Sequence, residues 1–210
     1  MLFVNDIFYS IQGESSFAGY PCLFIRLAGC NINCSYCDTP DALSIEDSRQ
    51  MKTEEIMCEL TGLSKNIKLV EITGGEPLMQ EGVHDLFKVL IGSGYKILLE
   101  TNGTIVLRDV PQEVVKIVDI KCPSSGFSGY VDYKNLEYIK EDDEIKFVIG
   151  TEEDYNFAKN FLLEQPLKTQ KIIFSPVAGR IAPGELALKI LKDEISVRLG
   201  LQIHKVINLK

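Results

Sequence analysis

The chain has 210 residues, 45% of them hydrophobic, and a formal net charge of −8 at pH 7. This length and composition allow one domain with a sizeable core. The acidic balance argues against a general nucleic-acid-binding protein, which would carry a basic face. No apolar run approaches the ~18 residues of a membrane span, and the first residues do not resemble a signal peptide. We therefore expect a cytoplasmic protein with no membrane or nucleic-acid partner.

Strand and helix patterns alternate along the chain without a linker. Strands are expected at 22–28, 68–73, 95–100, 114–120, 144–149, 171–174 and 197–204. Helices are expected at 53–62, with Thr53 as its cap, and at 82–90, 152–164 and 183–194. This alternation predicts a parallel sheet covered by crossover helices. Functional groups in such α/β folds gather at the carboxyl ends of the strands.

Cys30, Cys34 and Cys37 follow the first predicted strand with the spacing C-x3-C-x2-C. Three thiolates can hold three corners of an iron–sulfur cluster, and sulfur ligands also suit zinc or copper. A structural cluster or zinc site normally takes four protein ligands. No fourth cysteine lies nearby, so a cluster here would leave one iron open for a substrate or cofactor. The alternatives are a zinc loop completed by a distant ligand, or three unrelated thiols.

The remaining cysteines are Cys22, Cys58 and Cys122. We expect all three to be core or site-lining thiols, because free cysteine usually behaves as a small buried hydrophobe. Six cysteines, three of them clustered, do not suggest a disulfide framework. A reducing compartment is therefore expected.

The cysteine loop resembles the signature of the radical S-adenosylmethionine superfamily, and residues 71–77, EITGGEP, resemble its glycine-rich turn. Paired glycines let backbone groups approach a ligand, and Glu76 could accept a hydrogen bond from a bound ammonium. The resemblance implies an incomplete (β/α) barrel with a mostly parallel sheet. It also implies one [4Fe-4S] cluster and S-adenosylmethionine bound at the open iron.

Further segments resemble the 7-carboxy-7-deazaguanine synthase family across nearly the whole chain. They are IQGES at 11–15, Arg26, Asp38-Thr39, ETNGT at 100–104 and LQIHK at 201–205. Two departures are Ser15, where the family usually has glycine, and residues 207–210, which lack its usual tryptophan. The resemblance implies ring contraction of 6-carboxy-5,6,7,8-tetrahydropterin to 7-carboxy-7-deazaguanine with loss of ammonia, within queuosine or related 7-deazapurine biosynthesis.

The same resemblance assigns ligands to residues, and the radical comes from the cofactor, so no side chain is assigned as catalytic. The cluster is assigned to Cys30, Cys34 and Cys37, and Mg2+ to Thr39. S-adenosylmethionine is assigned to Tyr36, Cys37, Asp38, Gly75, Glu76, Asp119, Ile120 and Lys121. The pterin is assigned to Ile11, Gln12, Gly13, Glu14, Arg26 and Thr73.

Elementary chemistry makes several of these assignments reasonable. Gln12 both donates and accepts hydrogen bonds, Glu14 can accept from ring N–H groups, and Arg26 can pair with a carboxylate as a fork. The alternative is a solvated loop for Gln12 and Glu14 and a surface ion pair for Arg26. Magnesium often has few protein ligands, so a lone Thr39 hydroxyl is adequate; otherwise Thr39 is a turn or cap residue.

We expect residues 1–210 to form one domain, with 1–20 as an amino-terminal substrate-binding segment and 21–210 as the partial barrel. The family suggests a homodimer and an electron donor such as flavodoxin or ferredoxin. Two other functions compete. A glycyl-radical-enzyme activase would have one cluster but no need for Gln12, Glu14 and Arg26. A non-catalytic metal-binding or electron-transfer protein would want four cysteines per cluster and would have little need for the glycine-rich turn.

Overall fold

Nine strands form one sheet in the computed structural model, which describes all 210 residues. The strands are β1 (Leu2–Ile11), β2 (Pro21–Leu27), β3 (Arg49–Met51), β4 (Leu69–Gly74), β5 (Lys96–Thr101), β6 (Val115–Ile120), β7 (Glu144–Ile149), β8 (Ile172–Pro176) and β9 (Arg198–Leu199). The helices are α1 (Thr53–Leu63), α2 (Val83–Gly92), α3 (Glu152–Glu164), α4 (Pro183–Lys192) and α5 (Ile203–Val206). Short 3-10 helices lie at Pro40–Ala42, Pro77–Met79, Pro123–Ser125, Ser128–Tyr130 and Tyr133–Tyr138.

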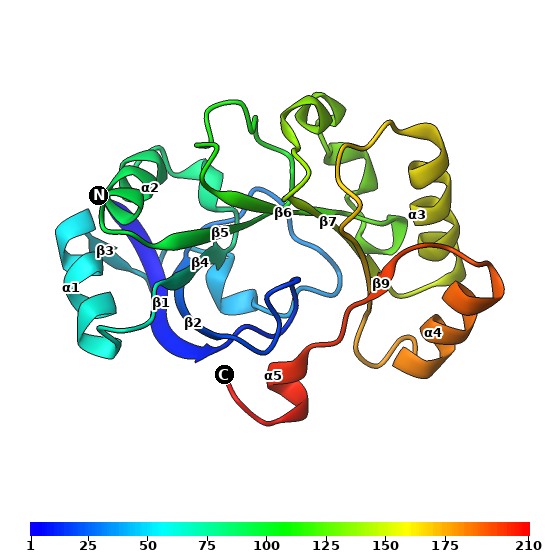
Figure 1. Ribbon diagram of the computed structural model, residues 1–210, viewed down its shortest axis with the longest axis horizontal. Helices are drawn as coiled ribbons and strands as arrows, with labels where there is room; N and C mark the ends of the chain where they lie inside the picture. The colour runs from blue at the N-terminus through cyan, green and yellow to red at the C-terminus, as the bar shows by residue number, and fades with distance from the viewer.

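The strand order is β3-β1-β2-β4-β5-β6-β7-β8-β9. From β2 through β9 the neighbouring strands are parallel, whereas β1 runs antiparallel to β2 and β3. Figure 1 shows α1 and α2 on one flank of the curved sheet and α3 and α4 on the other. The end strands β3 and β9 do not pair with each other. The predicted incomplete barrel with a mostly parallel sheet is therefore confirmed.

Hydrophobic periodicity explains how the helices pack on the outside of the sheet. In α2, the residues Val83, Leu86, Phe87 and Leu90 are all buried, and their spacing of three and four places them on one face of the helix. Helix α3 begins with a capping box, in which the Thr151 side chain accepts from the N–H three residues on. Helix α1 begins one residue earlier than predicted, because Thr53 is its first helical residue and Lys52 occupies the cap position.

The two ends of the chain differ most from the predicted elements. Strands β1 and β3 were not predicted, and β1 adds an antiparallel strand beside β2. The strand predicted at 197–204 is wrong beyond Leu199, since 203–206 is helical. At Gly200 a Cβ atom would collide with the Ser175 hydroxyl. The chain then leaves the sheet, and α5 lies between the β1–β2 hairpin and β9 (Figure 1).

The loop between β1 and β2 closes the amino-terminal end of the barrel. Phe17 packs against Leu98, Val115 and Ile117, which form an apolar cluster separate from the main core. The Ser16 N–H donates to the carboxylate of Glu144, at the start of β7. Because the loop enters the barrel from this end, it brings residues 12–14 toward the interior.

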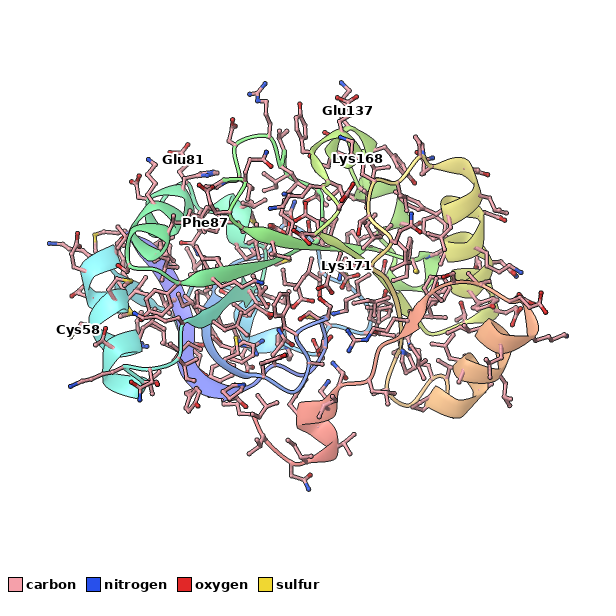
Figure 2. The ribbon with its side chains drawn as sticks, viewed as in Figure 1. Cys58, Glu81, Phe87, Glu137, Lys168 and Lys171 are labelled. Atoms are coloured by element: carbon pink, nitrogen blue, oxygen red, sulfur yellow. The ribbon has the colours of Figure 1, made fainter.

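The cysteines outside the cysteine loop do not all behave as predicted. Cys22 and Cys122 are buried, as expected, but Cys58 is exposed on α1, and Figure 2 shows it at the outer edge of the molecule. The expectation for Cys58 is therefore wrong, because its position on α1 faces solvent rather than the sheet. None of the helices combines the length and apolar character needed to cross a bilayer.

Candidate active site

A pocket of about 490 Å³ opens inside the barrel and extends to the cysteine loop. Its wall includes most of the predicted site residues, drawn from the amino-terminal segment, the cysteine loop and four strands. They are Ile11, Gln12, Gly13, Glu14, Arg26, Cys30, Cys34, Tyr36, Cys37, Asp38, Thr39, Thr73, Gly75, Asp119 and Lys121. Ile120 and Glu76 do not reach this pocket, since both side chains are fully buried elsewhere.

Cys30, Cys34 and Cys37 are free, half-buried thiols on the pocket wall. Backbone hydrogen bonds hold the loop, with Cys30 N–H donating to the Leu43 carbonyl at 3.2 Å and Cys37 N–H donating to Cys34 at 3.1 Å. Burial raises the pKa of Cys30, and it raises the pKa of Cys34 to about 11. Both are therefore neutral thiols at pH 7 until a metal deprotonates them.

The donor set fits an iron–sulfur cluster: three soft sulfur ligands without a fourth cysteine in the pocket. No three His, Cys, Asp or Glu side chains already enclose a metal-sized space. Asn102 lies beside the loop, with Nδ2 at 3.9 Å from Cys30 Sγ and 3.1 Å from Asn31 Oδ1.

Thr39 follows the loop and leads into the 3-10 helix at Pro40–Ala42. Its carbonyl accepts from Ala42 N–H at 3.0 Å, but its hydroxyl makes no cap hydrogen bond. The one nearby polar atom is Cys37 Sγ, at 4.0 Å. The Thr39 hydroxyl is thus available to a ligand in the pocket.

The glycine-rich turn supports the cysteine loop from beneath. A Cβ atom at Gly74 would collide with the Leu27 backbone, and one at Gly75 with the Gly29 carbonyl. The Glu76 N–H also donates to Gly29 at 2.8 Å. The two glycines therefore permit close approach by the backbone that precedes Cys30. Both also line the pocket, and their approach to a ligand stays a prediction.

Glu76 joins the same turn to the end of β5. Its carboxylate accepts from Leu78 N–H at 3.1 Å, Thr101 Oγ1 at 2.9 Å and Asn102 N–H at 2.7 Å. Burial raises its pKa despite these donors. The arrangement gives Glu76 a supporting position behind the pocket wall, and its contact with a bound ammonium stays a prediction.

Asp119 and Lys121 lie at the end of β6 and face the pocket. Lys121 Nζ donates to Asp119 Oδ2 at 2.8 Å, while Asp119 Oδ1 is buried without a hydrogen-bond partner. Burial alone would lower the pKa of Lys121, but the charge of Asp119 raises it. A buried carboxylate oxygen without a donor is uncommon, and it is suited to accept from a bound ligand.

Gln12 and Glu14 bring the amino-terminal segment into the pocket. The Gln12 amide donates to Glu71 on β4 and accepts from Glu14 N–H at 2.8 Å. Burial and the charges of Glu100 and Glu14 raise the pKa of Glu71 well above its usual range. Both functions of the Gln12 amide are thus already engaged within the protein.

Lys146 on β7 is a site residue that the sequence analysis missed. Its ammonium lies 2.7 Å from Glu14 Oε2 and 2.7 Å from Glu100 Oε1, and Thr73 Oγ1 lies 3.2 Å from Glu100 Oε2. Burial alone would raise the pKa of Glu14, but Lys146 outweighs it and lowers that pKa. The sequence pattern of β7 could have identified it. Lys146 lies between Ile145 and Phe147, which are both buried in the main core, so its side chain points to the opposite face of the strand.

Arg26 lies at the end of β2 without a salt bridge or a side-chain hydrogen bond to the protein. Its guanidinium is 5.6 Å from the centre of the Phe8 ring, and Phe8 stacks on Phe24 with ring centres 4.8 Å apart. The aromatic pair orients the guanidinium by a cation–π interaction. Its hydrogen-bond donors remain for an anion in the pocket.

The carboxyl-terminal segment covers one side of the pocket. Gln202 Nε2 donates to Glu14 Oε1 at 2.8 Å and to Asp38 Oδ2 at 3.1 Å, and Lys205 pairs with Asp38 at 3.0 Å. Loss of solvent alone would raise the pKa of Asp38, but Lys205 lowers it to about 2. A Cβ atom at Gly13 would collide with His204, so glycine is needed where this segment packs on the amino-terminal one.

Comparison with known proteins agrees with this geometry. Residues 24–120 match the model of the radical SAM superfamily. The chain is 44% identical to 7-carboxy-7-deazaguanine synthase of Koribacter versatilis, covering 97% of this chain and 96% of that protein. It is 42% identical to the Chlorobaculum tepidum protein of the same name, covering 97% and 93%. The crystal structure of QueE from Escherichia coli has the same fold, with a TM-score of 0.77 at 24% identity over 96% of this chain and 93% of that one.

Proposed function

The chain belongs to the 7-carboxy-7-deazaguanine synthase family, and we propose that it converts 6-carboxy-5,6,7,8-tetrahydropterin to 7-carboxy-7-deazaguanine with loss of ammonia, as a radical lyase of 7-deazapurine biosynthesis. One observation carries the proposal: the cysteine loop, Arg26 and the segment 11–14 all line the same pocket. A cluster site and a site for a polar, anionic heterocycle therefore adjoin each other. Such adjacency suits chemistry in which a cofactor acts on a small molecule.

The cofactor would lie at the carboxyl ends of the strands. Cys30, Cys34 and Cys37 would hold the [4Fe-4S] cluster, which supplies the electron for reductive cleavage of S-adenosylmethionine. The polar groups available to S-adenosylmethionine include the free oxygen of Asp119. Tyr36, Asp38, Gly75 and Lys121 line the same part of the pocket.

The pterin would lie deeper, between the cysteine loop and the barrel interior. Arg26 has unpaired donors for its carboxylate, while Glu14 and Thr73 line the wall beside it. We assign Mg2+ to the Thr39 hydroxyl, because this oxygen makes no cap hydrogen bond and lies between the cysteine loop and the pocket. Magnesium prefers such oxygen ligands and can orient a bound carboxylate.

The proposed reaction also needs a reducing compartment and an electron donor. All six cysteines are free, which agrees with the cytoplasmic, reducing location that we propose. We propose a flavodoxin or a ferredoxin as the electron donor and a homodimer as the working form.

The test is anaerobic reconstitution with iron and sulfide, followed by incubation with the pterin, S-adenosylmethionine, Mg2+ and a reductant. We expect 7-carboxy-7-deazaguanine, identified by chromatography and mass spectrometry, together with released ammonia. A reconstituted protein that cleaves S-adenosylmethionine but leaves the pterin unchanged would contradict the proposed substrate. A protein that holds zinc and no iron would contradict the radical chemistry itself.

A further inference from the structure

Lys146 is a buried cation at the centre of the pocket's acidic wall. Its side chain is 7% exposed, and its ammonium bridges Glu14 of the amino-terminal loop and Glu100 of β5. Glu71 of β4 and Asp119 of β6 face the same group, and Lys121 lies beyond Asp119. One lysine thus faces carboxylates from four separate parts of the fold.

A second buried lysine shows what a purely structural pair looks like. Lys116 on β6 is 1% exposed and pairs with Asp143 at 2.7 Å. Asp143 also accepts from the backbone N–H groups of Lys116 at 2.8 Å and Lys140 at 2.9 Å. Neither member lines the pocket. The charges of Lys116 and Asp143 are thus paired within the protein, and neither side chain is placed to contact a ligand in the pocket.

The groups around Lys146 differ because they remain in the pocket wall. Glu14, Glu71, Glu100 and Lys146 all line it. Carboxylates this close in a desolvated site cannot all stay ionised unless a cation offsets their repulsion. Lys146 supplies that cation, and it fixes the loop carrying Glu14 against β5. Removing Lys146 would change both the charge and the placement of these acceptors.

We propose that Lys146 is a positioning residue of the substrate site, which holds the carboxylates of Glu14 and Glu100 as paired acceptors for the N–H donors of the pterin ring. This assignment rests on the proposed function. The amino-pyrimidinone edge of a pterin presents adjacent N–H groups, and carboxylate oxygens accept such donors well. Lys146 therefore acts through its two glutamates rather than on the reacting atoms.

The experiment compares Lys146→Met and Lys146→Arg with the wild type after anaerobic reconstitution. Lys146→Met should weaken equilibrium binding of the pterin by at least about tenfold, because truncating one partner of a buried charge pair leaves the others unpaired. Lys146→Arg keeps the charge but moves it, so binding should weaken by roughly threefold or more, yet less than in Lys146→Met. Iron content should equal the wild type in both variants, because Lys146 has no hydrogen bond or salt bridge to the cysteine loop.

Lys116→Met is the matched control, since it removes the other buried lysine. It should lower the unfolding temperature and leave pterin affinity within about twofold of the wild type. Unchanged pterin affinity in Lys146→Met would overturn the assignment, as would a parallel loss of iron and S-adenosylmethionine cleavage. If Lys146→Met does not fold, wild-type pterin affinity in Lys146→Arg would overturn it instead. A wild type that binds no pterin would overturn the proposed function, and this assignment with it.

Discussion

The two ends of the pocket differ in how much of their hydrogen-bonding capacity is already used. At the cofactor end, three thiols, the Thr39 hydroxyl and Asp119 Oδ1 have few protein partners. At the substrate end, Gln12, Glu14, Glu100 and Lys146 bind one another. The cofactor end is held open by backbone packing, whereas the substrate end is a network of charged side chains.

This difference has a physical consequence for each end. Ligands at the cofactor end add interactions to groups that have few protein partners, so changes there should remove binding with little effect on folding. At the substrate end Arg26 is unpaired, but a ligand that binds Gln12, Glu14 or Glu100 must exchange internal hydrogen bonds for its own. Changes there should therefore alter stability and pH dependence as well as affinity.

The largest effect is expected from Cys34→Ala. Removing one of three sulfur ligands should abolish the visible absorbance of the cluster and all cleavage of S-adenosylmethionine. The unfolding temperature of the metal-free protein should hardly change, because the thiol is only half-buried. Cys58→Ala is the matched control and should retain full iron content. A Cys34→Ala protein with wild-type iron would remove this loop from the cluster site.

Arg26→Ala should weaken pterin binding by about 2–5 kcal/mol, the usual effect of removing one partner of a desolvated charge pair. Substrate-free cleavage of S-adenosylmethionine should remain, since the guanidinium lies on the Phe8 side of the pocket. Binding is measured by titration of the reconstituted enzyme. Arg49→Ala, at an exposed pair with Glu59, serves as the control with no expected change. Equal loss of both activities would mean that Arg26 supports the fold or the cluster.

Thr39→Ala should blunt the dependence of turnover on Mg2+, because its methyl group offers no oxygen ligand. Thr39→Ser should keep most of that dependence, and iron content should be unchanged in both. The measurement is turnover against Mg2+ concentration after chelation. An alanine variant with lower thermal stability and the wild-type Mg2+ response would show instead that Thr39 is only a turn residue.

The smallest expected effect concerns Glu71, at the substrate end, and it appears in how the stability of the protein depends on pH. Its pKa in the folded protein is raised, so its contribution to stability is present in acid and is lost as the pH rises through that raised value. Glu71→Gln should abolish this loss, so the variant should become increasingly more stable than the wild type as the pH rises from roughly 5 to 8. Thermal unfolding across this range tests it. Parallel stability curves for variant and wild type would refute the raised pKa.

The sequence predicted the cofactor end better than the substrate end. The cysteine spacing is local, so three ligands could be read from eight residues, and the strands leading to them are continuous apolar runs. The role of Lys146 depends on Glu14 and Glu100, which are 132 and 46 residues away along the chain. No local pattern specifies such a bridge, although a lysine between core residues of one strand indicates an inward-facing charge.

Tertiary packing also decided the features that the sequence left unpredicted. Strand β1 continues to Ile11 because it pairs with β2 along its length. At the other end, the alternation of Leu199, Leu201 and Ile203 favours a strand, yet the Ile203 N–H donates to the Gly13 carbonyl at 3.0 Å. That contact turns the segment over the pocket. In both cases the partner is far away in the sequence.

The central claim is that the cofactor end and the substrate end of the pocket can be impaired independently. The ratio of 7-carboxy-7-deazaguanine formed to S-adenosylmethionine cleaved tests it most directly. We expect a high ratio in the wild type, a low ratio in Arg26→Ala because cleavage continues without productive substrate binding, and neither product nor cleavage in Cys34→Ala. Cleavage that falls in step with product formation in Arg26→Ala would contradict the account.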